Sequence, residues 1–177
     1  MDTKKLMLRA KSGDREAFGQ LYAQFYVSVF RYIYLRVSDK KEAEDLAQEV
    51  FLKTYRSIDR YKETASDPLA YFFTVARNSV IDFYRKKKEI SLEGNEEILQ
   101  VHDFKNDPEE EFNKNEAKEK MMRAINNLSE EQKEVVILKF INDMSNQEIA
   151  RLLGKNEPAV RQIQHRALEN LQKILKD

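Results

Sequence analysis

The chain has 177 residues, enough for one large or two small domains, and with 41% hydrophobic residues it can bury a core. Its 35% charged residues, four glycines and three prolines are typical of many exposed helical faces and few tight turns, which predicts an all-α fold. The formal net charge is zero, and the absence of cysteine excludes disulfides and thiolate zinc sites.

The first part of the chain shows two helical segments with clear starting residues. Asp14 precedes a periodic run over 16–37, and Asp39 with Glu42 has the spacing of a capping box for a helix that ends near Tyr61. No stretch of the chain looks like a signal peptide or reaches transmembrane length, so we expect a soluble cytoplasmic protein without direct membrane insertion. The first run is rich in aromatic residues, whose spacing assigns them to packing: Phe18, Tyr22, Phe25, Tyr26, Phe30 and Tyr34.

A third helix is predicted from Pro68, which Asp67 caps, to about Lys88. The face expected in the core carries Leu69, Phe73, Ala76, Val80 and Phe83. The opposite face carries Tyr71, Thr74, Asn78, Asp82 and Arg85. The helix closes with four cations at 85–88, and these either complement the helix dipole or bind phosphate. Four cations in succession repel one another, which favours the phosphate interpretation.

Aromatic and amide side chains beside phosphate-binding cations can stack on unpaired bases or form hydrogen bonds with them. Tyr71 and Asn78 are the candidates for this role. Tyr71 is equally interpretable as a half-buried anchor with its hydroxyl in water. Asp82 lies three or four residues from Asn78, Arg85 and Lys86, so we expect it to position these groups rather than to meet phosphate.

Residues 91–107 are charged and poorly periodic, which predicts a flexible acidic linker between two small helical domains, 1–90 and 108–177. Between 89 and 119 there are eleven acidic residues and three lysines, a local charge of −8 that the rest of the chain balances with +8. Basic ends on an acidic connector suit a protein that touches DNA at two places.

The segment 146–168, NQEIARLLGKNEPAVRQIQHRAL, has the spacing of a helix-turn-helix. Ala150 lets two helices cross closely, and Gly154 supplies the positive φ that the turn needs. The second helix, from Asn156 or Glu157, leaves one side free to enter a major groove. An ordinary helical hairpin with a glycine C-cap is the alternative. The apolar stripe of the second helix consists of Val160, Ile163, Ala167, Leu171 and Ile174. Capping boxes mark two preceding helix starts, at Ser129 with Gln132 and at Ser145 with Glu148.

No catalytic site can be assembled from the sequence. The two histidines, His102 and His165, lie in the acidic linker and on the last helix, and no nucleophile pair, phosphate-binding glycine loop or metal-ligand spacing occurs. We therefore predict no enzyme activity, no catalytic residue, no cofactor and no metal.

Three segments together resemble an ECF-type bacterial RNA polymerase sigma factor: EAEDLAQEVFLKTYRSIDRY (42–61), DPLAYFFTVARNSVIDFYRKKK (67–88) and LSEEQKEVVILKFINDMSNQEIARLLG (128–154) with its following helix. The resemblance implies a promoter-specificity subunit without catalysis of its own. The first domain would be sigma region 2, which binds the clamp helices of the polymerase β′ subunit and melts and reads the −10 element. The second would be region 4, which binds the β flap and reads the −35 element. Core RNA polymerase, promoter DNA and an anti-sigma factor are the implied partners.

The resemblance assigns the polymerase-binding positions of region 2 to Asp45, Gln48, Glu49 and Lys53, for which a solvated charged face is the alternative. It leaves Ala47, Val50 and Leu52 as apolar positions against the helix's own domain. The −10 contacts would be Tyr71, Thr74, Arg77, Asn78, Arg85, Lys86, Lys87 and Lys88. The loop 62–67 would hold a flipped base. Tyr71 stands where the family commonly has Trp.

In region 4 the expected −35 contacts are Asn156, Pro158, Arg161, Gln162, His165 and Arg166. The chain reads PAVRQIQHRAL where members often read GTVKSRLHRAL, so the usual Arg–Leu pair becomes Ile163–Gln164 and the base-reading set differs. Arg161 could read guanine and Gln162 adenine, at roughly 1–3 kcal/mol each, or the cations could only hold phosphate.

Two other classes of protein fit parts of the sequence. A dimeric repressor or activator would use the helix-turn-helix on duplex DNA, but the 85–88 cations beside base-stacking candidates and the lack of a ligand-pocket pattern argue against it. An adaptor or antagonist would use its helices on a protein partner, and the basic ends argue against that.

Overall fold

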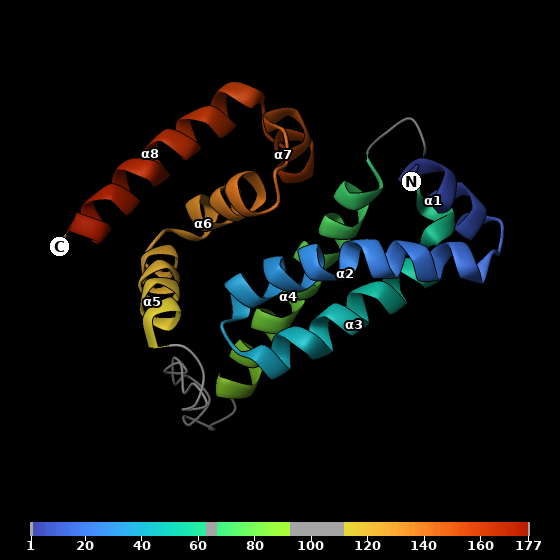
Figure 1. The fold of residues 1–177 in the computed structure, drawn as a ribbon, viewed down its shortest axis with the longest axis horizontal. Coiled ribbons are helices and arrows are strands. Elements are labelled where there is room, and N and C mark those ends of the chain that lie inside the picture. Colours follow the sequence, from blue (N-terminus) through green and yellow to red (C-terminus); the bar gives the residue numbers. More distant parts are fainter. Residues whose placement is uncertain (1, 63–66, 93–111, 177) are drawn as a thin grey trace. The chain divides into compact units, whose positions relative to one another are not determined.

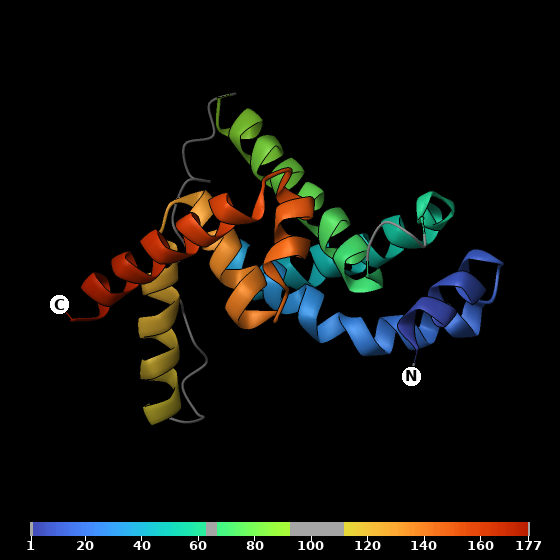
Figure 2. The ribbon, with the colours of Figure 1, turned by 90° about the horizontal axis from the view of Figure 1, so that it is seen from above.

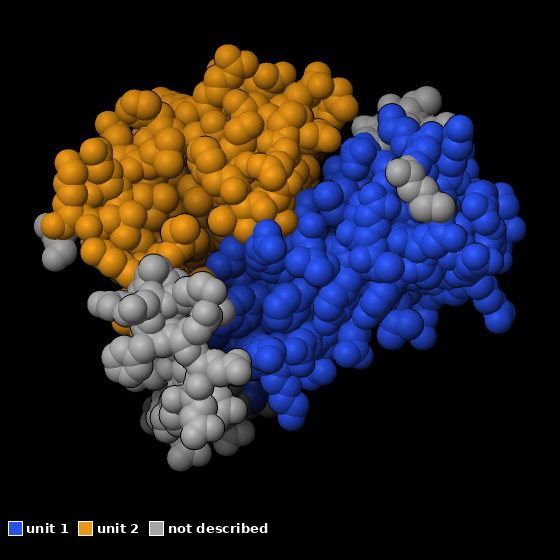
Figure 3. All heavy atoms as spheres, viewed as in Figure 1, with its two compact units in different colours: residues 1–102 blue, residues 103–177 orange. Residues whose placement is uncertain are grey.

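The computed structural model describes residues 2–62, 67–92 and 112–176, and in this part of the chain all regular structure is helical (Figure 1). The chain divides into two compact units, 1–102 and 103–177, coloured separately in Figure 3. The all-α prediction is confirmed for the described residues. Most of the predicted linker, from residue 93 onward, lies outside them, so the limits 1–90 and 108–177 stay predictions.

The described residues of unit 1 form four helices and one short 3-10 turn. The helices are α1 (Thr3–Lys11), α2 (Arg15–Val37), α3 (Lys40–Arg56) and α4 (Pro68–Leu92), and the turn is Ile58–Arg60. Helix α1 folds back along the start of α2 (Figures 1 and 2), with its apolar side chains buried. The largest fully buried side chains of the unit are Met7, Leu21, Val29, Tyr32, Ile33, Val50, Tyr61, Phe72 and Phe73.

The starts of α2, α3 and α4 lie where the sequence predicts them. Asp14 accepts a hydrogen bond from the Ala17 amide at 3.0 Å, and Asp39 accepts one from the Glu42 amide at 2.8 Å. Asp67 likewise accepts from the Leu69 amide at 2.9 Å. Each carboxylate satisfies an amide that has no partner within the helix, and its charge complements the helix dipole.

Two helix ends of unit 1 differ from the prediction. Helix α3 ends at Arg56 rather than near Tyr61. The Ser57 amide is shared between Lys53 O at 3.0 Å and Thr54 O at 3.2 Å, and the second of these bonds has the spacing of a 3-10 turn. The Ser57 hydroxyl also donates to Lys53 O, at 2.8 Å. The chain then enters the 3-10 turn. Helix α4 continues to Leu92, beyond the expected end at Lys88. Helix α1 is absent from the prediction. Asp2 caps it by accepting from the Lys4 amide at 3.1 Å.

Unit 2 contains α5 (Phe112–Asn126), α6 (Glu130–Val136), a π-helical stretch (Ile137–Ile141), α7 (Asn146–Leu153) and α8 (Glu157–Lys176). The capping boxes at Ser129 and Ser145 are both present, as predicted. Gly154 has φ +65°, which confirms the turn between α7 and α8, and α8 begins at Glu157 as expected. The π-helical stretch has no counterpart in the prediction.

The apolar stripe of α8 forms the centre of unit 2. Val160 and Ala167 are fully buried, and Ala167 lies in a cluster with Leu128 and Val136, against which Leu171 packs. Ala150 of α7 is also buried, as expected for a close helix crossing. The helix-turn-helix prediction is therefore confirmed in its spacing and in its packed face. None of the described helices is both long and apolar enough to cross a membrane.

Candidate nucleic-acid and protein interfaces

The outer face of α3 carries the side chains expected to bind polymerase. Asp45, Gln48 and Glu49 are exposed, while Lys53 is partly buried. The Lys53 ammonium lies 2.8 Å from Glu49 Oε1 and donates to Ser79 Oγ of α4 at 3.2 Å. Lys53 therefore links α3 to α4, a contact that the sequence alone does not indicate.

The expectation that Leu52 packs against its own domain is wrong, because 57% of its surface is exposed. The buried positions of α3 recur at spacings of three and four, and Leu52 lies outside that stripe: Ala43, Leu46, Ala47, Val50, Phe51 and Thr54. Leu52 shares the outer side of α3 with Gln48, one turn earlier, and with Tyr55, one turn later.

Two aromatic side chains enlarge this exposed apolar area. Tyr55 is 39% exposed, and its ring packs edge-on against Phe18 of α2 at 4.9 Å. Tyr22 is also 39% exposed and lies 4.6 Å from the ring of Phe51. We call Tyr22, Leu52 and Tyr55 the α2–α3 patch. Its residues were assigned to packing or left out of the sequence prediction.

The aromatic residues of α2 also pack against one another and against α4. Tyr22, Tyr26, Phe30 and Tyr34 stack along the helix, with successive ring centroids 5.2, 6.1 and 5.8 Å apart. Burial raises the pKa of Tyr26 and of Tyr34, because a phenolate would lose its hydration there. Phe25 is buried and contacts Phe72 of α4 at 5.3 Å.

On α4, Tyr71 is held by the end of α3. Its hydroxyl donates to Ser57 O at 2.8 Å and lies 3.2 Å from Ser57 Oγ, and its ring meets Tyr61 edge-on at 5.6 Å. The half-buried anchor is thus present, and its hydroxyl is bonded to the backbone rather than to water.

The other −10 candidates on α4 differ in exposure. Thr74 and Asn78 are exposed, and Thr74 Oγ1 donates to Ala70 O at 3.0 Å. Arg77 is partly buried.

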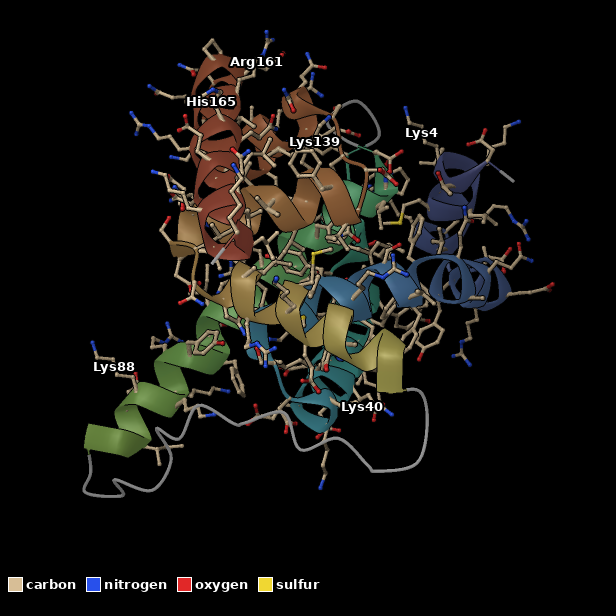
Figure 4. The ribbon with its side chains drawn as sticks, turned by 60° about the vertical axis from the view of Figure 1, so that its left-hand side comes forward. Lys4, Lys40, Lys88, Lys139, Arg161 and His165 are labelled. Atoms are coloured by element: carbon tan, nitrogen blue, oxygen red, sulfur yellow. The ribbon has the colours of Figure 1, made fainter. Side chains whose placement is uncertain are left out.

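The four cations that end the predicted third helix are not equivalent. Arg85 lies 3.1 Å from Asp82 and 4.0 Å from Glu89, so the expected contact between Asp82 and Arg85 is present. The Lys87 ammonium lies 3.6 Å from Glu42 of α3 and 5.4 Å from the centre of the Phe83 ring. Lys86 and Lys88 are exposed and form no ion pair with a described residue (Figure 4 labels Lys88).

On α8, the polar residues expected to face the −35 element are exposed: Asn156, Pro158, Arg161, Gln162, His165 and Arg166. Arg161 and His165 point away from the body of the helix (Figure 4), and each has an acidic neighbour on α8 itself. Arg161 pairs with Glu157 at 3.0 Å, and His165 Nδ1 lies 3.5 Å from Glu169. Asn156 also caps the helix by accepting from the Ala159 amide at 2.9 Å.

Three polar contacts between elements hold α8 and its preceding turn in unit 2. Gln164 donates to Asn146 of α7 at 2.7 Å, and Asn170 donates to Gln132 of α6 at 3.2 Å. Lys155 in the turn pairs with Glu131 at 2.6 Å. The sequence alone does not indicate these partners. Among the described residues, no group of three acidic or histidine side chains is placed to hold a metal ion.

Comparison with known proteins agrees with this arrangement. The profile of Sigma-70 region 2 matches residues 21–90, and that of Sigma-70 region 4 matches residues 118–171. The ECF RNA polymerase sigma factor BldN of Streptomyces coelicolor is 35% identical over 173 residues, which are 98% of this chain and 66% of that protein. The chain belongs to the sigma-70 family, as an ECF sigma factor.

Further relatives cover the sigma factor from end to end. The ECF RNA polymerase sigma factor SigW of Bacillus subtilis is 28% identical, over 100% of this chain and 98% of that protein. CnrH, solved in complex with the cytosolic domain of CnrY, has a TM-score of 0.76 at 23% identity, covering 99% and 98% of the two chains. RpoE of Bartonella quintana, solved with the anti-sigma factor NepR, has a TM-score of 0.76 at 22% identity, covering 90% of this chain and 96% of that chain. As a member of this family, the protein is a promoter-directing subunit of bacterial RNA polymerase.

Proposed function

We propose that this sigma factor binds core RNA polymerase through the outer face of α3 and the α2–α3 patch. One observation carries the proposal: the exposed polar residues Gln48 and Glu49 adjoin Leu52 and Tyr55, which are large, apolar and exposed. An apolar centre with a polar rim is the usual composition of a protein interface. A wholly solvated charged face, the alternative, has no reason to expose Leu and Tyr together.

Within the same proposal, residues 1–90 act as region 2 and residues 108–177 as region 4. Tyr71, Thr74, Arg77 and Asn78 meet the melted −10 strand, and the cations at 85–88 hold its phosphates. The exposed side of α8 reads the −35 element through Arg161 and Gln162, with Asn156, Pro158, His165 and Arg166 beside them. Region 4 also binds the β flap. The exposure of Thr74, Asn78, Arg85, Lys86 and Lys88 on α4, and of the named residues at α8, supports their roles, since each can reach a ligand without unfolding. Tyr71, Arg77 and Lys87 are partly buried.

The sigma factor has no catalysis of its own in this proposal, because RNA synthesis is carried out by the core enzyme. It works in the cytoplasm, where its polymerase and promoter partners are found. An anti-sigma factor holds it inactive, as the solved complex of RpoE with the anti-sigma factor NepR suggests by analogy.

The test is transcription in vitro with purified bacterial core polymerase on a fragment library of the host genome, followed by sequencing of the transcripts. The proposal expects new start sites that share a two-part upstream motif. Retention of duplex fragments by the protein alone, without any gain in initiation, would instead support the dimeric repressor or activator.

The polymerase site is tested with Leu52→Asp, which places a charge in the centre of the patch. Affinity for core polymerase should fall about thirtyfold or more, the effect of losing an interface hot spot of about 2 kcal/mol. Val27→Asp is the matched control, because Val27 is equally exposed (58%) on α2 outside the patch. Equal losses for the two variants, or no loss for Leu52→Asp, would exclude this face of α3 as the binding site.

A further inference from the structure

We propose that the hydrogen bond between Gln164 and Asn146 is a positioning contact that sets the orientation of α8 on α7, and with it the −35 bases that the sigma factor prefers. The inference rests on the proposed function, in which α8 reads the −35 element. Neither residue is among the predicted DNA contacts, and each would act on specificity through the helix that carries Arg161 and Gln162.

The bond joins one helix to the fixed end of another. Gln164 is partly buried and follows Ile163 on the inner flank of α8. Its Nε2 donates to Asn146 Oδ1 at 2.7 Å. Asn146 is the first residue of α7, and the preceding Ser145 forms a complete capping box with Glu148. The acceptor is therefore carried on a rigid helix start rather than on a loop.

Apolar packing restricts rotation of α8 less tightly. Ile149 and Ala150 on α7 and Val160 on α8 are buried apolar side chains, and apolar burial is non-directional, so a small rotation of α8 changes the buried area little. A hydrogen bond weakens steeply once its length or angle departs from the optimum. Gln164 lies between Arg161 and His165 in the sequence, so a rotation that breaks the bond moves both exposed side chains along the groove.

The other two polar ties act elsewhere. Asn170 donates to Gln132 at 3.2 Å, and Lys155 pairs with Glu131 at 2.6 Å. Both hold α8 and the turn against the start of α6. Neither of them joins α7 to α8, whereas the Gln164–Asn146 bond spans the two helices of the helix-turn-helix.

The experiment measures base preference at the −35 element for core polymerase with the full-length sigma factor, on promoters randomised there and constant at −10. Gln164→Met removes the donor at similar length, and Asn146→Ala removes the acceptor while Gln164 remains. Both should shift the ratio between the best −35 sequences in the same direction, by about threefold or more, since a displaced base contact loses part of its discrimination. Gln172→Met is the matched control, because Gln172 is exposed on α8 and forms no side-chain hydrogen bond with a described residue.

The double variant Asn146→Gln with Gln164→Asn keeps the amide pair and its combined length, so it should restore the original preference. Thermal melts of every variant separate folding from specificity. A shift for Gln164→Met but not for Asn146→Ala would overturn the inference, because Gln164 would then read a base itself. Uniform loss of transcription with unchanged preference would also overturn it and leave the bond a stabilising contact.

Arg161→Ala distinguishes the inference from the function on which it rests. If Arg161→Ala changes −35 preference and the amide variants do not, only the positioning role fails. If Arg161→Ala, Gln164→Met and Asn146→Ala all leave the preference unchanged, the proposed reading of the −35 element by α8 fails and the inference fails with it.

Discussion

The two helices proposed to meet promoter DNA, α4 and α8, hold their cations in different ways. On α4, Lys87 is 24% exposed and reaches back to Glu42 of α3, while Arg85 pairs with Asp82 and Glu89. On α8, Arg161 lies 3.0 Å from Glu157 and His165 Nδ1 lies 3.5 Å from Glu169, each an acidic neighbour one turn away on the same helix. Helix α4 therefore uses part of its cationic cluster for the packing of unit 1, and α8 keeps Arg161 exposed.

The difference shows that a run of cations in a sequence does not measure the charge that is available to a ligand. Exposed ion pairs contribute about 0–1 kcal/mol, so phosphate can displace them readily. Moving Lys87 away from Glu42 to bind phosphate costs more free energy, because the move also breaks the contact of its ammonium with the Phe83 ring and the ion pair that links α4 to α3. Lys86 and Lys88, which have no such tie to a described residue, should supply most of the binding.

The largest effect on promoter opening tests this division on α4. Lys86→Glu combined with Lys88→Glu should reduce promoter opening about tenfold or more. The slope of log K for promoter binding against log salt concentration should also become shallower by at least about 1.4, because two phosphate contacts on a single strand are lost. Permanganate footprinting of open promoters and titration at several salt concentrations would measure both. Lys40→Glu with Lys41→Glu makes the same charge change on exposed residues of α3, and an equal loss for that pair would contradict the prediction.

The next effect is on −35 base preference and concerns two exposed residues of α8. Arg161→Ala and Gln162→Ala should each change preference at one or two −35 positions, with a loss of discrimination of about 5- to 150-fold, the equivalent of roughly 1–3 kcal/mol. Sequencing of transcripts from a −35 library would show the affected position, with Gln172→Ala as the control. A uniform loss across all sequences would reassign these side chains to phosphate contact.

A smaller effect of opposite sign is expected for Asp82→Asn. This change releases Arg85 from its partner at 3.1 Å and removes a negative charge from the outer face of α4, so affinity for single-stranded −10 DNA should rise about two- to threefold. Fluorescence anisotropy of the polymerase holoenzyme with a −10 oligonucleotide would measure it. Glu16→Gln removes an exposed acidic residue elsewhere in unit 1 and serves as control. A fall in affinity would mean that Asp82 holds Arg85 in its binding orientation.

The smallest effect is on stability and depends on pH. The bond from the Ala17 amide and the nearby Arg9 guanidinium lower the pKa of Asp14 below its usual 3.8. A carboxyl whose pKa is lower in the folded state stabilises the protein above the unfolded value, and this contribution disappears as the pH falls through the folded value. Asp14→Asn keeps a capping oxygen, so the variant should melt slightly below the wild type at pH 7, and the difference should shrink when the pH is lowered to 2.5. A constant difference at both pH values would exclude the charge as its cause.

Helix starts and the helix-turn-helix could be predicted because their signals are local. Asp14, Asp39, Ser129 and Ser145 cap helices by bonding amides only two or three residues away, and Gly154 meets a local need for positive φ. Such contacts are encoded within one turn of chain. The apolar stripe of α8 follows from its period for the same reason.

Contacts between elements could not be predicted in the same way. Periodicity places Lys53 and Gln164 on a helix but does not identify Ser79 or Asn146 as their partners, which lie 26 and 18 residues away in the chain. Leu52 was assigned to the interior because it is apolar, although its place outside the buried stripe exposes it. Helix α1 was missed because its nine residues show little more than two turns of pattern.

Helix α1 bears on how sigma domains are exchanged between proteins. A chimera that takes region 2 of this chain at the limits of the family profile, 21–90, would leave behind α1 and the first six residues of α2. The core would then lose the buried side chains of Leu6 and Met7. The transplant would also lose the bond of 2.9 Å from Lys11 to the carbonyl of Tyr61. A domain borrowed for synthetic promoter control therefore needs its first twenty residues to keep both its core and this contact.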